Sequence, residues 1–337
     1  MGDVSFQGIE ASESLEVWRE CVTHVPGLFC YPSPWTEPTA AQQGVAPVSR
    51  WSDDERLRVN ASPLDGEDTE DGMKVALGVV LGVLLLHLPA SAETGFLDRM
   101  ITMGAAMYPY QVYVPAEHTR ARSWPVVVFL HGDGAQGQDG LMPTARGLAD
   151  AIRFERSRFP VIAVFPQAEK GKRWLDADME ELVIAELDQT MREFGGDPMR
   201  VYLTGFSMGA TGAYRIAYRW PNRFAAVAAI AGRVETSDVK TYSDREKAAD
   251  RQANPFVSAA DPFAALALRI KHLPIRIFHG DADETVPVEQ SRHLTRALQA
   301  AQADVHYQEY VGETHVGAAQ KAWAESEWIT WLLTQDR

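Results

Sequence analysis

The feature that most constrains the fold is a serine flanked by glycines, at the point where a predicted strand gives way to a predicted helix. The run 200–204 is rich in β-branched and aromatic residues, Gly205-Phe206-Ser207-Met208-Gly209 follows it, and the next residues are small. Glycine has no Cβ, so these flanking residues permit a tight, strained turn that holds the serine hydroxyl clear of the sheet. A serine hydroxyl is a weak nucleophile until a base takes its proton. We therefore predict that Ser207 is a catalytic nucleophile, with an ordinary strand-to-helix turn as the alternative.

This pattern is similar to the nucleophile turn of the α/β-hydrolases, in which the serine, the acid and the histidine follow one another in that order along the chain. Downstream of Ser207, residues 274–280 read as a buried strand that ends in an acidic loop. A carboxylate just past a strand end can orient an imidazole. Asp281, Asp283 and Glu284 all qualify by position, and solvated loop charge is the alternative for Asp281 and Glu284.

The same order selects the base among the nine histidines. His293 lies in a helical pattern and His306 in an alternating strand, so both have ordinary structural explanations. His315 lies in a loop bounded by Gly312 and Gly317, directly after the last predicted strand. We predict that His315 is the base, with a surface histidine as the alternative.

An oxyanion site needs two backbone N–H groups aimed at the developing negative charge. One is expected from Met208, the residue after the nucleophile. The other is expected from the loop that follows the apolar run 125–130, which reads as a strand buried on both faces. That loop begins His131-Gly132-Asp133-Gly134, and the amide of Asp133 or Gly134 is the predicted second donor.

Residues from about 108 to 331 resemble the esterase, poly(3-hydroxybutyrate) depolymerase and feruloyl esterase branch of the α/β-hydrolase superfamily, including bacterial predicted peptidases and phospholipase/carboxylesterases. The resemblance rests on the stretches 109–115, 127–134, 165–167, 200–209 and 224–227 and on the acid and histidine loops. It favours Asp283 as the acid, because many of these enzymes place it in an Asp-x-x-Val-Pro turn. It implies hydrolysis of a small-molecule or polymeric ester. A serine peptidase of the same fold and a non-enzymatic binding protein are the alternatives.

Two residues are expected to contact the substrate, and one segment is a candidate cap over it. Trp174 follows the predicted strand end at 165–167, where it suits a pocket wall, although a buried aromatic plug is nearly as good an explanation. His131 opens the predicted oxyanion loop, where it would also face the substrate. The polar segment 232–261 forms either a small cap over the pocket or an ordinary surface excursion.

Alternating predicted strands and helices indicate a mostly parallel sheet covered by helices on both faces. The strand candidates are Gln111–Val114, Val126–Leu130, Val161–Phe165, Val201–Thr204, Ala225–Ile230, Ile275–Phe278 and Val305–Tyr310. The helix candidates are Met179–Phe194, Ser207–Tyr218, Gln290–Ala301 and Ala319–Leu333. The fold class expected is therefore α/β, of the α/β-hydrolase type.

The segment 73–92 reads as a secretory signal peptide. Met73-Lys74 begins it, an apolar stretch covers 75–88, and Ala90-Ser91-Ala92 is a small-residue cleavage site. Cleavage near Ala92 would export a catalytic domain of residues 93–337 to the periplasm or medium, with no stable membrane insertion; a membrane anchor is the alternative. The acidic residues 1–72 read as a disordered extension that is either untranslated, with Met73 as the start, or a cytoplasmic tail.

Charge and composition bound the remaining classes of function. The formal net charge is −14 and no basic stripe occurs, so no nucleic-acid partner is expected. No metal-ligand spacing is present and no cofactor is expected. The two cysteines, Cys21 and Cys30, lie in the N-terminal extension and receive no role. Oligomeric state is not encoded in any of these patterns.

Overall fold

A computed structural model describes residues 93–235, 244, 247–248 and 256–337. By its internal contacts the chain divides into Met1–Gly78 and Val79–Arg337, and every described residue lies in the second unit. The predicted extension at 1–72, the predicted signal peptide at 73–92 and most of the predicted cap at 232–261 lie outside the described residues. The predictions made for them stay predictions.

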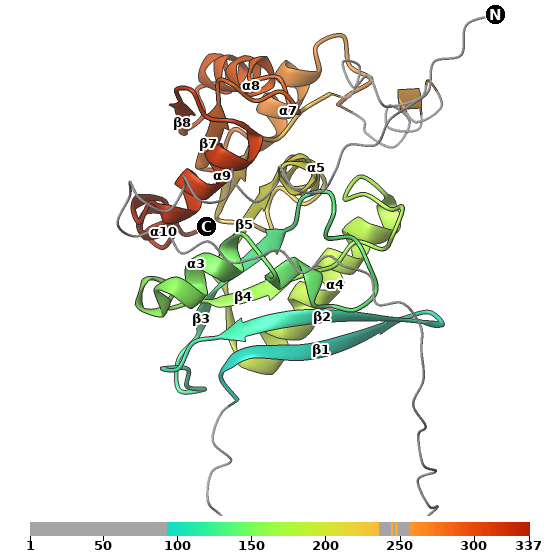
Figure 1. Ribbon diagram of the computed structural model, residues 1–337, viewed down its shortest axis with the longest axis vertical. Helices are drawn as coiled ribbons and strands as arrows, with labels where there is room; N and C mark the ends of the chain where they lie inside the picture. Colours follow the sequence, from blue (N-terminus) through green and yellow to red (C-terminus); the bar gives the residue numbers. More distant parts are fainter. Residues whose placement is uncertain (1–92, 236–243, 245–246, 249–255) are drawn as a thin grey trace, which may run out of the picture. The chain divides into compact units, whose positions relative to one another are not determined.

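An eight-stranded sheet in the order β1-β2-β4-β3-β5-β6-β7-β8 forms the centre of this unit (Figure 1). Strands β1 and β2 form an antiparallel hairpin, β2 pairs antiparallel with β4, and every later pairing is parallel. The strands are β1 Gly95–Met103, β2 Ala106–Val114, β3 Trp124–Leu130, β4 Ile162–Phe165, β5 Gly196–Phe206, β6 Ala226–Ile230, β7 Ile275–Gly280 and β8 Val305–Tyr310. The carboxyl ends of the parallel strands therefore meet along one edge.

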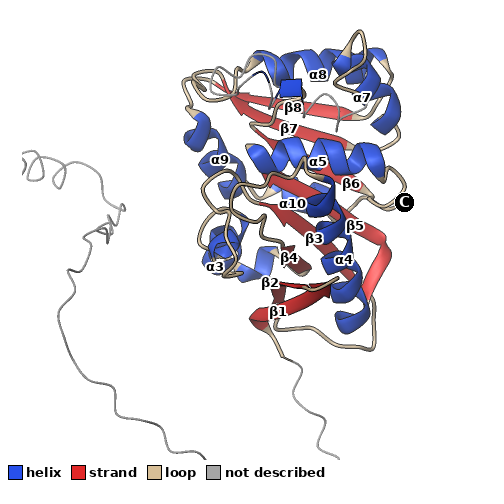
Figure 2. Cartoon of the chain, turned by 90° about the vertical axis from the view of Figure 1, so that its right-hand side faces the viewer, coloured by secondary structure: helices blue, strands red, loops and turns tan. Residues whose placement is uncertain are grey.

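Helices cover both faces of the sheet (Figure 2). The core on one face joins the sheet to α4 Ala177–Phe194, α5 Met208–Arg219, α7 Pro262–Ile270 and α8 Glu289–Ala300. The core on the other face joins it to α3 Leu148–Phe154, α9 His315–Ala324 and α10 Glu327–Leu332. Strand β3 supplies both cores because its side chains alternate: Val126 and Val128 enter the first, Val127 and Phe129 the second. This double burial is why the strand is an unbroken apolar run.

The structure confirms the predicted fold class and places a strand at each of the seven predicted positions. It corrects the start of the sheet, because β1 and the first half of β2 precede the first predicted strand, and β1 pairs with the whole of β2 as a hairpin. It also corrects the last predicted helix: residues 319–333 contain the end of α9 and all of α10, separated by Glu325, whose extended backbone ends the first helix. None of the described helices is long and apolar enough to cross a membrane.

Helix α4 carries a buried carboxylate that has no hydrogen-bond partner. The Glu186 side chain is fully buried on the face of α4 that packs toward the sheet, and neither of its oxygens has a partner. Burial raises its pKa well above the usual value for a glutamate. The folded chain therefore keeps the Glu186 proton to a higher pH than the unfolded chain does.

This difference predicts a pH-dependent stability cost. Above the unfolded-state pKa of about 4.3, the unfolded chain releases a proton that the folded chain keeps, so the free energy of unfolding falls as pH rises toward the folded-state pKa. Glu186→Gln removes this titration, and its stability relative to the parent should increase from pH 5 to pH 8. Urea unfolding at both pH values measures this. Glu181→Gln, an exposed change on the same helix, is the control and should show no such trend.

Candidate active site

Ser207 lies in the turn between β5 and α5, and its backbone is strained. Its φ of 56° and ψ of −117° lie in a region that side chains other than glycine rarely adopt. The Ser207 amide donates to the Ile230 carbonyl of the neighbouring strand at 2.9 Å, which fixes the turn to the sheet. Such strain is held in place only by surrounding structure, and it is typical of a functional serine at the end of a strand.

The two glycines of the turn are required by close packing. A Cβ on Gly205 would lie 2.5 Å from the backbone of Gly209, and a Cβ on Gly209 would lie 1.9 Å from the carbonyl oxygen of Leu130. Real Cβ atoms do not approach so closely. The start of α5 therefore rests directly on the end of β3, and the small residues seen in the sequence are what permit that contact.

Three side chains from separate loops at the carboxyl edge of the sheet form one chain of hydrogen bonds. The Ser207 Oγ lies 2.8 Å from His315 Nε2, and His315 Nδ1 lies 2.6 Å from an oxygen of Asp283. Ser207 follows β5, Asp283 follows β7, and His315 begins α9 after β8. The His315 ring also stacks at a tilt on Phe206, with centroids 4.8 Å apart. This arrangement can pass the serine proton to the imidazole.

The structure distinguishes among the three acids that the sequence left open. Asp283 is the one whose carboxylate contacts His315, and its side chain is fully buried. Asp281 instead accepts a hydrogen bond from the Gly312 amide at 2.6 Å, and Glu284 is exposed. The other histidines considered, His293 and His306, lie on α8 and β8 as expected, where His293 packs against Phe263.

Asp283 is held as an anion by its hydrogen bonds. Burial alone would raise its pKa, but donors from His279, His315 and the Val286 amide outweigh burial and bring that pKa below the usual range for an aspartate. One carboxylate oxygen accepts from the amides of Thr285 and Val286, each at 2.8 Å. The carboxylate therefore stays charged opposite His315 throughout the neutral pH range.

Sequence reasoning did not find His279, which lies 3.1 Å from Asp283 by its Nε2. It is fully buried at the end of β7, where the sequence offers only a histidine inside an apolar strand. Its position two residues before the acidic loop was the available signal.

The loop predicted to supply the second oxyanion donor is fastened at several points. Its Gly137 amide donates to the Ala168 carbonyl at 2.9 Å. The buried Gln167 side chain donates to Ala135 O at 3.0 Å and accepts from the Gly140 amide at 2.7 Å. Asp133 and Gly134 are exposed at the tip of this loop. Met208 is the first residue of α5, where helix N–H groups have no partner within the helix, so its amide is available as a donor.

His131 and Trp174 do not line a pocket wall, which corrects their expected role as substrate contacts. Both side chains are buried, with Trp174 0% and His131 2% exposed. Trp174 Nε1 donates to the His131 carbonyl at 2.9 Å, and the His131 ring accepts from the Ala168 amide at 3.0 Å. Burial lowers the pKa of His131 to about 4, so its ring is neutral and can accept that bond. Both residues therefore hold the start of the loop after β3 in place.

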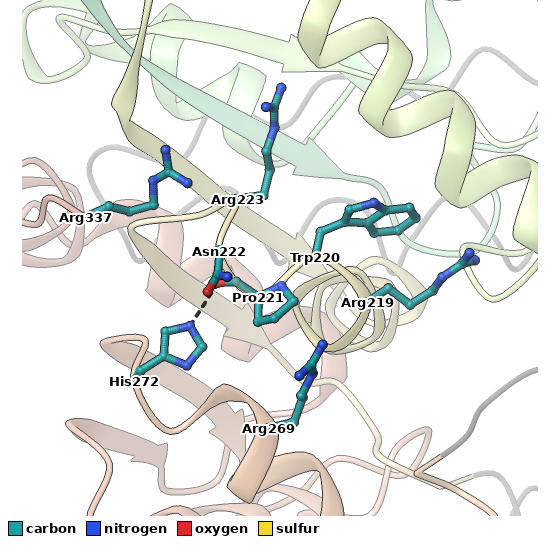
Figure 3. Close-up of a pocket in the computed structure, with 8 residues that line it drawn as sticks. All are labelled: Arg219, Trp220, Pro221, Asn222, Arg223, Arg269, His272 and Arg337. Carbon is teal, nitrogen blue, oxygen red and sulfur yellow. Dashed lines mark hydrogen bonds between the residues drawn. The ribbon is translucent and has the colours of Figure 1, made fainter.

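A cavity of about 600 Å³ lies apart from these residues, at the amino ends of β6 and β7 (Figure 3). Four arginines line it, and two of them are held by carboxylates: Arg219 by Glu180 and Arg223 by Asp188. His272 of the same cavity bonds to the Pro221 carbonyl at 2.9 Å. None of the predicted site residues lines it. Among the described residues, no group of three or more histidine, cysteine or acidic side chains could hold a metal ion.

Comparison with known proteins agrees with this geometry. Residues 170–334 match the prolyl oligopeptidase family. A solved thermostable esterase is 27% identical to the chain with a TM-score of 0.58, over 72% of this chain and 63% of the esterase. The chain belongs to the α/β-hydrolase superfamily. An acylaminoacyl peptidase from Pyrococcus horikoshii shares the fold at 16% identity and a TM-score of 0.55, over 75% of this chain and 42% of the peptidase.

A curated relative adds one further likeness for this α/β-hydrolase. It is an uncharacterized secreted protein of Arthroderma benhamiae, 24% identical over 220 residues that make up 63% of this chain and 22% of the relative. The chain therefore spans less than two thirds of the length of the relatives named here. The family match begins at residue 170, so it includes the three hydrogen-bonded side chains and excludes the loop after β3.

The contact between α5 and β3 predicts the effect of a single methyl group. Gly209→Ala should displace the turn, because its Cβ cannot occupy a point 1.9 Å from the Leu130 oxygen. We expect hydrolytic activity to fall by about 100-fold or more, the cost of moving a nucleophile by roughly 1 Å. The control is Gly104→Ala, in the β1–β2 turn, where φ is +61° but no atom lies within 4 Å. That change should cost some stability and leave activity intact; equal activity losses in the two variants would contradict the packing argument.

Proposed function

We propose that this chain is a serine hydrolase that cleaves carboxylic esters, with Ser207 as nucleophile, His315 as base and Asp283 as the orienting acid. The observation that carries the proposal is the hydrogen-bonded chain from Ser207 Oγ through His315 to Asp283, with distances of 2.8 and 2.6 Å. Its placement on a strained turn at the end of a central strand adds support, because that is where this fold presents a nucleophile.

The proposed reaction passes through an acyl-enzyme. His315 Nε2 takes the proton of Ser207 as Oγ attacks the ester carbonyl, and the imidazolium that forms is stabilised by the ionised Asp283. His315 then gives that proton to the departing alcohol, leaving the acyl group on Ser207. A water molecule, deprotonated in turn by His315, attacks the acyl-enzyme, and the acid product leaves with the serine restored.

The tetrahedral intermediates carry a negative oxygen, for which we assign two backbone donors. The Met208 amide at the start of α5 is the first, and the amide of Asp133 or Gly134 is the second. The support for this assignment is the set of hydrogen bonds that hold the second donor loop in place. The bonds from Ala168 and Gln167, together with the buried Trp174, hold the loop after β3 beside the turn of Ser207.

Ester rather than peptide hydrolysis is favoured by the esterase, the more similar of the two solved structures compared above. A serine peptidase is the second candidate, because the matching family is that of prolyl oligopeptidase. Both reactions use the same three side chains, so the difference lies in the leaving group and the pocket. Nothing in the proposal requires a cofactor, and we expect a small-molecule or polymeric ester as substrate, with no nucleic-acid partner.

A panel of chromogenic substrates tests the proposal. The parent protein should hydrolyse short p-nitrophenyl esters much faster than acylaminoacyl or prolyl p-nitroanilides. Ser207→Ala should lower ester turnover by several orders of magnitude, about 10⁴-fold or more, because the nucleophile is lost. Ser123→Ala, an exposed change at the amino end of β3, is the control and should retain activity. Faster cleavage of the anilides would favour the peptidase, and normal turnover by the Ser207 variant would end the assignment.

We further propose that the enzyme is exported with cleavage near Ala92. The support is the signal-like segment at 73–92 and a relative described as secreted. The first described strand begins at Gly95, so such cleavage would leave the sheet whole.

Deletion of residues 1–92 should therefore give a folded and active enzyme, because every described strand and every proposed catalytic side chain follows that point. N-terminal sequencing of the protein from its native host should find a terminus close to Glu93. The same protein found in the cytosol with Met1 as its first residue would contradict both the signal peptide and the start at Met73.

A further inference from the structure

His279 contacts the same oxygen of the proposed acid as the proposed base does. It lies one residue before the end of β7, is fully buried, and pairs in register with Glu309 of β8. Its Nε2 lies 3.0 Å from the Val286 carbonyl oxygen and 3.1 Å from an oxygen of Asp283. Its Nδ1 lies 2.7 Å from the hydroxyl of Ser291 on α8. The ring therefore ties a strand, the acid loop and a helix together.

These partners determine which nitrogen carries the proton. A carbonyl oxygen and a carboxylate can only accept, so Nε2 must be protonated to bond to either of them. The Ser291 hydroxyl can donate or accept, so Nδ1 is satisfied whether or not it carries a proton. In both its neutral and its charged form, His279 therefore presents one Nε2 proton that the Val286 carbonyl and the Asp283 carboxylate share.

This contact adds to the hydrogen bonding of Asp283. One carboxylate oxygen accepts from the amides of Thr285 and Val286, and the other pairs with His315 Nδ1 at 2.6 Å and lies 3.1 Å from His279 Nε2. An ionised carboxylate offers about four acceptor positions, and here each of them faces an N–H group. Because the side chain is fully buried, water cannot replace a donor that is removed.

From this geometry we infer that His279 is a positioning residue for the proposed hydrolysis. It acts on His315 through Asp283, and it touches neither Ser207 nor the reacting atoms. It orients the Asp283 carboxylate so that one oxygen faces His315 Nδ1. It also partly neutralises the negative charge on that oxygen, which both histidines contact. The inference rests on the proposed function of the Ser207, His315 and Asp283 set.

Two polar substitutions of His279 distinguish the effect of its N–H donor to Asp283 from the effect of filling the space with a side chain. His279→Gln places an amide N–H near the position of Nε2 and keeps the donor to Asp283. His279→Asn is too short and reaches only the position of Nδ1, beside Ser291. Both variants place an amide side chain in the site. A loss of folding would therefore affect both, and it would not produce a difference in labelling rate between them. His306→Asn, an exposed change on the neighbouring strand β8, is the control.

The rate of labelling by a fluorophosphonate probe is the first measurement, because it reports the reactivity of Ser207 without depending on the natural substrate. His279→Gln should label within about threefold of the parent, whereas His279→Asn should label about 10- to 100-fold more slowly, the range expected for a misplaced catalytic group. The control should match the parent. In ester turnover, the loss in His279→Asn should fall on kcat with KM little changed, since His279 does not contact substrate.

The pH profile provides a readout that a purely structural role would not move. The charged groups facing His279 are Asp283 in the acid loop and Glu309 on β8. When the donor to Asp283 is lost, more negative charge remains opposite His315, which favours its protonated form. The acid limb of the labelling rate should therefore shift to higher pH in His279→Asn and stay in place in His279→Gln.

Equal labelling rates and equal acid limbs in the Gln and Asn variants would overturn the inference. The outcome is distinct from failure of the proposed function, which would appear in the parent as no labelling, or as labelling that persists in Ser207→Ala. If both His279 variants label slowly but their acid limbs do not move, His279 serves the packing of β7 alone, and the inference is again overturned.

Discussion

The close approach of α5 to the end of β3 is the constraint on which the rest of the site depends. The space between Gly209 and the Leu130 carbonyl has no room for a side chain. That contact sets where the helix begins, and hence the strained backbone of Ser207 and the direction of the Met208 amide. It also brings the loop after β3 beside the proposed nucleophile, because Leu130 ends β3 and that loop begins at His131. One steric condition therefore positions the nucleophile and both predicted oxyanion donors.

Around this contact, buried polar groups fix the loop after β3 and the carboxylate of Asp283. His131, Gln167 and Trp174 anchor one loop through bonds to backbone atoms, and Asp283 is held by donors on all sides. A buried carboxylate is unstable as an anion unless such donors compensate for the lost water. Here they do, and the result is a fixed negative charge beneath His315. Glu186 shows the contrast, because burial without donors raises its pKa instead.

Much of the fold could be predicted because buried parallel strands are uninterrupted apolar runs, as β3 and β6 are. The first strand, Gly95–Met103, was missed because it lies at the sheet edge and is half exposed, so polar residues interrupt its pattern. The break between α9 and α10 was missed because no glycine or proline marks it: only Glu325, whose backbone is extended, and Ser326 separate the two helices. Tertiary contacts decide where such strands and helices begin and end, and the local pattern of apolar residues does not reveal those contacts.

The residues of the proposed site also differ in how far the sequence identifies them. Ser207 and His315 were identifiable from their motif and chain order, because the turn and the loop leave local signatures. The choice of Asp283 over Asp281 needed a resemblance, since all three acids occupy one loop and only the fold shows which carboxylate faces His315. Trp174 and His131 were placed at the pocket wall, but aromatic residues near a site serve equally well as buried supports. His279 offered only its position two residues before the acidic loop as a signal, because a histidine inside an apolar strand has no specific pattern of its own.

The most direct test of the central claim is to trap the acyl-enzyme. The protein is mixed with p-nitrophenyl acetate, quenched in acid at early times, and digested for mass spectrometry while release of p-nitrophenol is followed in parallel. The account predicts an acetyl group on Ser207 that appears at the rate of the first release of p-nitrophenol and is absent when Ser207 is alanine. Sustained turnover with no modification of Ser207, or with the acetyl group accumulating on another residue at the catalytic rate, would contradict it.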